Sequence, residues 1–370
     1  MFINIAPSTI SGAFHMRFGS GERKFLLSLF FCGMVAGWQI SGLAQGADKK
    51  SGFQTQEVKF DGAGVKLAGT MLTPKLDAGK RAAAVLIVGD TNASGRDGIN
   101  IGSASHGIYK SIAEHLVSRG LVVLRYDSRC KGTSECKPAD VFDDYVDDAH
   151  GAFNYLKTQS QVDPAQVLIF GHGEGGIIAA TVTAQEESKT TGLVLAATPG
   201  RYLGKWLREK TQKQMIEAGK SSADISAYLQ KFDRVTRGIT SGQSDFSQIK
   251  LDEKDPYDAV LQDLIKRQRI VVSLLINDPL QIAASVKAPV LILQGAKDLE
   301  VGVKDGQFLD ESLKRVYNTD VKLAIIDNMD HLLKTNTAEA SFASYSNASR
   351  PLDPVFLKVL SDWVASKVKP

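Results

Sequence analysis

The regular alternation of buried strands and helices between residues 82 and 197 constrains the fold of this chain most strongly. Four continuous apolar runs mark strands that are buried on both faces: Ala82–Val88, Leu121–Tyr126, Val167–Phe170 and Gly192–Ala197. Helical periodicity lies between them, for example over Ile108–Arg119. Such alternation predicts an α/β fold with a mostly parallel, doubly wound sheet and right-handed crossovers.

The alternation stops after residue 200 and returns near residue 289. Residues 201–283 are charged and have a helical pattern, as at Leu203, Trp206 and Leu207. The pattern therefore predicts one sheet domain, residues 45–200 and 284–370, interrupted by a helical insert over 201–283. Further elements predicted in this domain are a hairpin of Gln56–Phe60 and Val65–Thr73, a strand over Pro289–Gln294, a helix over Leu313–Tyr317, a strand over Lys322–Ile326 and a helix over Val355–Ser366.

The first 44 residues have the features of a cleavable signal peptide. A net-positive lead ends at Lys24, an apolar run covers Phe25–Trp38, and Gly42-Leu43-Ala44 is a small-x-small cleavage signal. The run is shorter than the about 20 residues that a membrane-spanning helix needs. We therefore expect a secreted or periplasmic protein, with an uncleaved membrane anchor as the alternative.

The cysteine pair and the net charge are compatible with a secreted or periplasmic protein. Cys130 and Cys136 lie six residues apart in a predicted loop and could form a disulfide in an oxidising compartment, or remain free thiols. Residues 1–44 hold three basic residues and one acidic residue, so a net charge of +1 remains on 45–370. No basic patch indicates nucleic-acid binding.

The most informative segment is the turn that follows the strand Val167–Phe170. Its sequence is Gly171-His172-Gly173-Glu174-Gly175-Gly176, and a helix of small residues follows. A strand, a sharp Gly-rich turn and a helix form the setting of the nucleophile elbow, G-x-S-x-G. Here the central residue is Gly173, which has no side chain to act as a nucleophile.

A dinucleotide-binding loop is the alternative for this turn. G-x-G-x-x-G matches at Gly171, Gly173 and Gly176. However, the turn follows the third strand of the alternation, and no acidic residue ends a strand about 20 residues further on. We therefore expect no cofactor. We also expect no metal, because His172 and Glu174 have no further ligands near them in sequence.

Two later strand ends provide an acid and a base in the chain order of hydrolase triads. Asp298 follows the strand and turn of Leu291–Gly295, and His331 follows the strand Leu323–Ile326. Asp298 alone has an ordinary alternative, since an aspartate commonly caps a helix or a turn. Their order and context together predict that Asp298 and His331 are the acid and base of a triad.

Several further motifs make the chain similar to a known family. The chain resembles the bacterial α/β-hydrolases related to serine aminopeptidases and carboxylesterases over residues 55–200 and 284–368. The motifs are Arg96-Asp97-Gly98, Arg125-Tyr126-Asp127 with Arg129, Gly132 and Ser134, Asp163-Pro164, Gly171-His172, Pro199-Gly200-Arg201, and Gln294-Gly295 with Lys297-Asp298.

The resemblance implies the hydrolase fold with a helical cap over the site, and it implies specific roles. In the family the residue at position 173 is the attacking serine, and the residue at the position of Glu174 supplies an oxyanion-hole amide. The loop of Asp90 and Thr91 supplies the other amide. The expected activity of the family is hydrolysis of ester or peptide bonds.

Three departures from the family pattern affect this chemistry. Gly173 replaces the nucleophile, and Asp90 stands in a loop that is Gly/Ser-rich in relatives. A carboxylate at Asp90 would oppose the formation of an oxyanion. Cys130 replaces the usual glycine. Glycine also relieves the backbone strain of the elbow, about 1–3 kcal/mol, so a chain released from catalysis would gain stability from it.

Three functions remain open from the sequence. The first is a hydrolase-family protein that is degenerate as a serine hydrolase and binds a small ester or peptide-like ligand. The second is an active hydrolase that uses water activated by His331, or a non-standard nucleophile such as Thr91. The third is a module that binds a partner through its surface.

Overall fold

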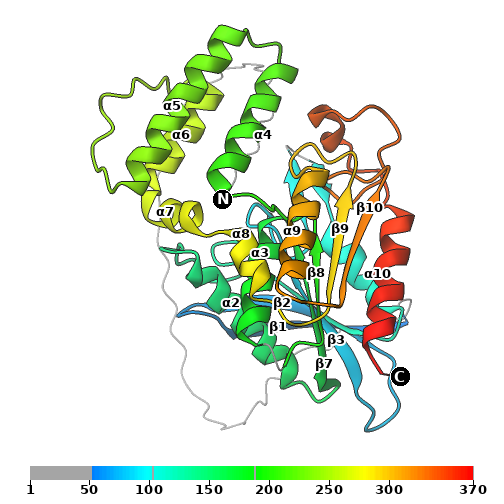
Figure 1. Cartoon of the computed structure of the whole chain (residues 1–370). Coiled ribbons are helices and arrows are strands. Elements are labelled where there is room, and N and C mark those ends of the chain that lie inside the picture. The colour runs from blue at the N-terminus through cyan, green and yellow to red at the C-terminus, as the bar shows by residue number, and fades with distance from the viewer. Residues whose placement is uncertain (1–51, 102–103, 187–188, 370) are drawn as a thin grey trace, which may run out of the picture.

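Figure 1 shows the computed structural model, which describes residues 52–101, 104–186 and 189–369. The predicted signal peptide, residues 1–44, lies outside these residues.

A central sheet of eight strands forms the core, in the order β1-β2-β6-β3-β7-β8-β9-β10. Only β1 and β2 run antiparallel to their neighbours, so the predicted mostly parallel α/β sheet is confirmed. The strands are β1 Phe53–Asp61, β2 Lys66–Pro74, β3 Ala82–Val88, β6 Val122–Tyr126, β7 Val162–His172, β8 Gly192–Ala196, β9 Val290–Gly295 and β10 Val321–Ile326. A separate hairpin joins β4 Ile99–Ile101 to β5 Ala104–His106.

Helices cover both faces of this sheet. Strand β3 shows why, because Leu86 belongs to one apolar cluster and its neighbours Val85 and Ile87 belong to another. Both faces of the strand must therefore be buried. The helices that pack on the sheet domain are α1 Ile108–Val117, α2 Asp143–Lys157, α3 Glu174–Gln185, α8 Pro279–Ala284, α9 Val303–Arg315 and α10 Pro354–Lys367.

Most of the predicted insert, residues 201–283, forms a helical cap that stands over one end of the sheet (Figure 1). Its helices are α4 Leu203–Glu217, α5 Ser222–Thr240, α6 Pro256–Lys266 and α7 Gln268–Ile276. Apolar side chains such as Phe232, Val235 and Leu261 are buried between these helices. Helix α8, which ends the predicted insert, packs against α3 and α9 of the sheet domain.

Two elements begin more than three residues before their predicted starts, and one hairpin was not predicted. Strand β7 begins at Val162, not Val167, because Val162 pairs with Ala82 of β3. Helix α9 begins at Val303 and ends before Tyr317, which is 90% exposed and has φ 64°. The β4–β5 hairpin was not predicted, since three-residue strands are too short to show a period.

A buried ion pair fixes the segment after β6. The Arg129 guanidinium binds both carboxylate oxygens of Asp148 in α2, at 2.7 and 2.9 Å, and both side chains are 1% exposed. Asp148 also accepts the backbone N–H of Ala63 at 2.9 Å. In the loop that follows Arg129, Cys130 and Cys136 are joined by a disulfide.

We predict that Asp148→Ala lowers the free energy of unfolding by about 3–5 kcal/mol, because it leaves Arg129 buried without its partner. Urea unfolding at neutral pH measures this loss. The matched control is Asp61→Ala, which removes a pair with Lys66 whose side chains are 77% and 64% exposed. That change is expected to cost at most about 1 kcal/mol, and equal losses for the two variants would contradict the prediction.

Candidate active site

The predicted elbow is a sharp bend between β7 and α3. Gly173 sits at this bend with φ 58° and ψ −129°, a conformation that costs a non-glycine residue about 1–3 kcal/mol. Its N–H donates to Ala196 O at 3.0 Å, and its carbonyl accepts from Gly176 N at 3.1 Å. The backbone thus has a strained bend that would present a side chain at position 173, although the residue there has none.

The neighbouring glycines are required by close packing. A Cβ on Gly171 would lie 2.5 Å from Gly175 O, and a Cβ on Gly175 would lie 2.3 Å from Gly89 O. Strand β7, helix α3 and the loop after β3 therefore approach more closely than any larger residue would allow.

The Asp90 carboxylate occupies the place of the missing side chain. An ideal Cβ on Gly173 would lie 1.9 Å from Asp90 Oδ2 and 2.9 Å from Asp90 Cγ. The same Oδ2 accepts the backbone N–H of Glu174 at 3.2 Å, which is the amide that the family resemblance assigns to the oxyanion hole. Asp90 is 6% exposed, so this carboxylate is well shielded from water.

A short hydrogen bond holds Asp90 in this orientation. Its Oδ1 accepts the N–H of Asn92 at 2.7 Å, which closes an Asx turn in the loop after β3. The neighbouring Thr91 hydroxyl donates to the Glu174 carboxylate. Burial and the nearby Asp90 carboxylate raise the pKa of Glu174. Thr91 therefore faces the Glu174 side chain, and the carboxylate of Asp90 faces position 173.

Asp298 and His331 meet beside this bend. Asp298 follows β9, and its Oδ2 accepts from His331 Nδ1 at 3.0 Å. Its Oδ1 accepts the N–H groups of Glu300 and Val301, each at 2.8 Å, so the carboxylate cannot turn away from the imidazole. His331 is 4% exposed. This is the arrangement of an acid that orients a base.

A second carboxylate, Glu300, faces the other nitrogen of the imidazole. Its Oε2 lies 3.9 Å from His331 Nε2. The same oxygen pairs with Lys210, a buried residue of cap helix α4. The indole N–H of Trp206 donates to the Glu300 carbonyl at 2.7 Å. Helix α4 of the cap is thus anchored directly on the segment that holds the acid.

These carboxylates set the charge of His331. Burial by itself lowers the pKa of the imidazole, but Asp298, Glu300 and Asp90 outweigh burial and raise it to about 9. His331 is therefore an imidazolium at neutral pH. Burial also opposes ionisation of Glu300, yet Lys210 and His331 lower the pKa of its carboxyl group.

A buried chain of hydrogen bonds joins the loop of Asp90 to the loop of His331. The Asp90 N–H donates to the Tyr109 hydroxyl at 2.7 Å, and this hydroxyl lies 2.9 Å from His172 Nδ1. His172 Nε2 lies 2.8 Å from the His331 carbonyl, which can only accept. His172 must therefore carry its proton on Nε2, and Tyr109 donates to Nδ1. Burial and His331 lower the pKa of His172 to about 4, which keeps it neutral.

The structure therefore gathers Gly173, Glu174, Asp90, Thr91, Asp298 and His331 in one place. Sequence reasoning missed Glu300 and Lys210 at this site. Glu300 stands only two residues after Asp298, but its partner Lys210 is 90 residues away in the chain, and no local pattern links the two. Within the described residues, no group of three or more His, Cys, Asp or Glu side chains is arranged to hold a metal ion.

A small pocket lies between the cap and the elbow. Its volume is about 20 Å³, and its walls include Thr91, Glu174, Ile177, Leu274 and Pro279. That volume is close to the space of one water molecule. Any larger ligand at this place requires the walls to move apart.

Comparison with known proteins agrees with this fold. The family model described as serine aminopeptidase, S33, matches residues 102–337. Esterase EstD of Thermotoga maritima is 26% identical over 360 residues, which cover 95% of this chain and 78% of that protein. The recognition of an α/β-hydrolase family is thereby confirmed.

Two solved structures share the fold at low sequence identity. The esterase Pf2001 of Pyrococcus furiosus is 18% identical, with a TM-score of 0.54 over 88% of this chain and 94% of that chain. The α/β-hydrolase GrgF from Penicillium sp. sh18 is 16% identical, with a TM-score of 0.53 over 85% and 98% of the two chains.

We predict that Gly173→Ala lowers the free energy of unfolding through two separate costs. The overlap with Asp90 costs about 1–3 kcal/mol, and the backbone conformation costs about 1–3 kcal/mol more. In an Asp90→Ala background only the backbone cost remains. Urea unfolding of the four proteins measures the coupling. An equal cost of Gly173→Ala in both backgrounds would show that Asp90 does not occupy this space.

We also predict that His331 titrates near pH 9 in the folded protein, as followed by NMR of its ring protons. Its pKa is raised above the unfolded value of about 6.5. Its contribution to stability is therefore fully present below that value and is lost as pH rises through about 9. Asp90→Asn removes one carboxylate and is expected to lower the midpoint. A midpoint below 7 in the unmodified protein would refute this assignment.

Proposed function

We propose that this chain, which belongs to the serine aminopeptidase (S33) family, no longer hydrolyses its substrates by serine chemistry. The activity of the family is hydrolysis of ester or peptide bonds, and the relative in Thermotoga maritima is an esterase by name. One observation carries the proposal: the Asp90 carboxylate fills the place where a side chain at position 173 would stand.

The first step of serine hydrolysis requires an attacking hydroxyl at the elbow. Gly173 offers none. The Thr91 hydroxyl, on the loop after β3, is hydrogen-bonded to the Glu174 carboxylate. No acyl-enzyme can therefore form at position 173.

The second requirement is a site that stabilises an oxyanion. The Glu174 N–H, which would serve that site, already donates to Asp90 Oδ2 at 3.2 Å. A second negative charge at this place would be repelled by the carboxylate, and the repulsion is strong because the surroundings are buried. Asp90 thus acts as a tethered anion in the position that a reaction intermediate would need.

The third requirement is a neutral base. With a pKa of about 9, His331 is protonated at neutral pH and cannot accept a proton from a nucleophile. Glu300 adds to this state, since its carboxylate faces His331 Nε2, and Lys210 lowers the pKa of Glu300 and so keeps that carboxylate charged. All three requirements therefore fail at the same site.

We further propose that the pocket under the cap binds a small ester or peptide-like ligand without cleaving it. Apolar walls from Ile177, Leu274 and Pro279 support this, together with the polar groups of Thr91 and Glu174 at the same pocket. A few polar groups among apolar walls are typical of small-molecule sites. The volume of about 20 Å³ means that the cap must shift when such a ligand enters.

Secretion is part of the proposal. Disulfides persist in oxidising compartments, and Cys130 and Cys136 are bonded. None of the helices among the described residues is both long and apolar enough to cross a membrane. Sequencing of the exported protein should give an N-terminus at Gln45, and an intact Met1 or Met16 start on that protein would refute cleavage.

We predict that hydrolysis returns only when both elbow changes are reversed together, and only at a pH near or above about 9, where His331 becomes neutral. The assay compares four proteins on p-nitrophenyl esters and aminoacyl p-nitroanilides: the unmodified chain, Gly173→Ser, Asp90→Gly and the double variant. Gly173→Ser alone places its Cβ against Asp90, and Asp90→Gly alone has no nucleophile. The double variant should exceed each single variant by at least about tenfold, because one oxyanion-hole donor contributes about 10²–10³ in kcat.

The control is the double variant with His331→Ala, which should lose the regained activity. Turnover by the unmodified protein at the rate of an ordinary enzyme, about 1–10³ s⁻¹, would overturn the proposal.

A hydrolase that uses water deprotonated by His331 is the second candidate. The buried Asp298–His331 pair favours it, since an oriented base is retained. Such an enzyme would need neutral His331, so its rate would rise as pH passes through about 9. The same assay distinguishes it: the unmodified protein would be active, His331→Ala would abolish the activity, and Gly173→Ser would not raise it.

A further inference from the structure

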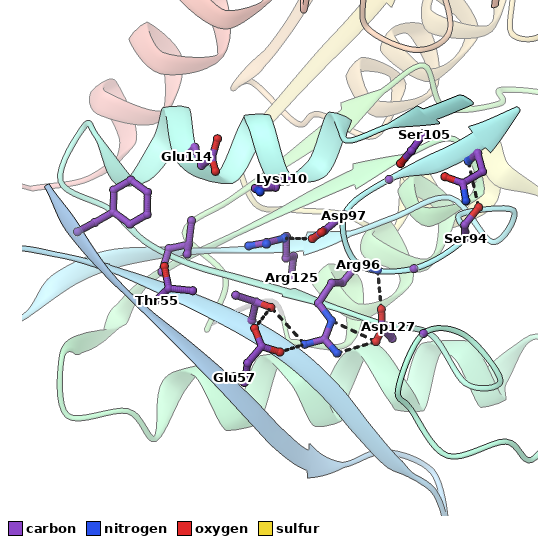
Figure 2. Close-up of a pocket in the computed structure, with 17 residues that line it drawn as sticks. Thr55, Glu57, Ser94, Arg96, Asp97, Ser105, Lys110, Glu114, Arg125 and Asp127 are labelled. Atoms are coloured by element: carbon purple, nitrogen blue, oxygen red, sulfur yellow. Dashed lines mark hydrogen bonds and ion pairs between the residues drawn. The ribbon is translucent and has the colours of Figure 1, made fainter. Parts of the chain in front are cut away.

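A second, larger cavity lies apart from the elbow, against helix α1 and the end of β6. Its volume is about 710 Å³, within the range of about 300–1,000 Å³ typical of ligand sites. Strands β1 and β2, the segment 94–100, helix α1 and the end of β6 form its walls (Figure 2). None of the residues placed at the elbow lines it, so this cavity is not part of the site described above.

Both signs of charge line this cavity, and one of its cations is fully engaged. Arg96 donates to Asp127 through Nε and Nη2, at 3.1 and 2.7 Å. Its Nη1 donates to Glu57 at 2.6 Å. Arg96 is therefore a structural crosslink between the loop after β3 and the sheet. Glu57 and Asp127 both pair with Arg96, so these three side chains together carry one net negative charge at the cavity wall.

Arg125 differs because its guanidinium is only partly satisfied. The residue is 5% exposed, and its Nε donates to Asp97 at 2.9 Å. Its Nη1 is buried and has no acceptor among the described residues. A buried donor without an acceptor is costly, about 1–3 kcal/mol. Arg125 also lines the cavity, and a guanidinium pairs well with the planar geometry of a carboxylate.

Two further charges lie on the adjoining face of α1. Lys110 and Glu114 both line the cavity, and Figure 2 shows them on the same helix, above Arg125 and Asp97. The cavity therefore offers two cations, Lys110 and Arg125, close to two acids, Asp97 and Glu114. Phe53 and Leu72 add apolar surface at the β1–β2 side.

We propose that this cavity binds a small zwitterion, a free amino acid or a short peptide with free termini. The ligand carboxylate is bound by Arg125 and Lys110, and its ammonium group is bound by Glu114 and Asp97. Phe53 and Leu72 contact its apolar side chains. No bond is made or broken in this step.

The balance of charge favours a zwitterion over a simple anion. Four acids and three basic side chains line the cavity: Glu57, Asp97, Glu114, Asp127, Arg96, Lys110 and Arg125. A simple anion would add to the surplus of negative charge. A zwitterion places its carboxylate beside Arg125 and Lys110 and meets the surplus of negative charge with its ammonium group.

The test is isothermal titration of the unmodified protein with three matched probes. L-leucyl-L-leucine has both charges, its N-acetyl form lacks the ammonium group, and its amide lacks the carboxylate. We expect the dipeptide to bind, and each blocked form to bind at least about tenfold more weakly, since each loses charge-assisted hydrogen bonds. The absence of dipeptide binding, or equal binding of either blocked form, would overturn the proposal.

Variants then assign each end of the ligand. In Arg125→Gln or Lys110→Gln, the dipeptide should bind little more tightly than its amide, because a partner of its carboxylate has been removed. In Glu114→Gln, the dipeptide should bind no more tightly than its N-acetyl form, because a partner of its ammonium group has been removed. Lys110 and Glu114 lie on the outer side of α1, so these two variants keep the test valid if Arg125→Gln does not fold.

The matched control is Arg208→Gln, which removes a guanidinium from cap helix α4 where it pairs with Asp233. Its affinity for the dipeptide should stay unchanged. Binding that persists unaltered in the Arg125, Lys110 and Glu114 variants would place the ligand elsewhere and refute this site.

Discussion

The hydrogen bond from the Glu174 amide to the Asp90 carboxylate defines the state of the whole site. It fixes the carboxylate beside Gly173, where an ideal Cβ would lie 1.9 Å from Asp90 Oδ2. The same negative charge helps to keep His331 protonated. A glycine at the bend and an aspartate on the facing loop are therefore complementary, because each accommodates the other. Their pairing is the basis of the proposal that the chain keeps the fold of its family without the serine chemistry.

Two further sets of contacts support this arrangement, one between the loops of the sheet domain and one from the helical cap. The chain of Asp90, Tyr109, His172 and His331 ties the two loops together through the elbow. Lys210 of cap helix α4 pairs with Glu300, and this pairing allows the Glu300 carboxylate to lie beside the His331 imidazole in addition to Asp298. Burial strengthens the interactions between these charged groups, and it makes each group costly to leave without a partner. Loss of one partner would disturb the others.

Much of this could be predicted from the sequence, because it depends on local patterns. Continuous apolar runs marked the parallel strands, and the turn at Gly173 was recognisable from its glycines. The order of Asp298 and His331 followed from strand ends. The family resemblance predicted an Asp90 carboxylate near the oxyanion hole, but the sequence could not predict that this carboxylate fills the space at position 173, since that depends on contact between residues 90 and 173. Glu300 and Lys210 were missed for the same reason, and the short β4–β5 strands gave no periodic signal.

The most direct measurement is intact-protein mass spectrometry after treatment with a fluorophosphonate, which adds covalently to an activated serine. Gly173 has no hydroxyl, and the Glu174 amide donates to Asp90, so we expect no added mass on the unmodified protein. An adduct that maps to the loops around Gly173, Asp90 or His331 would contradict it.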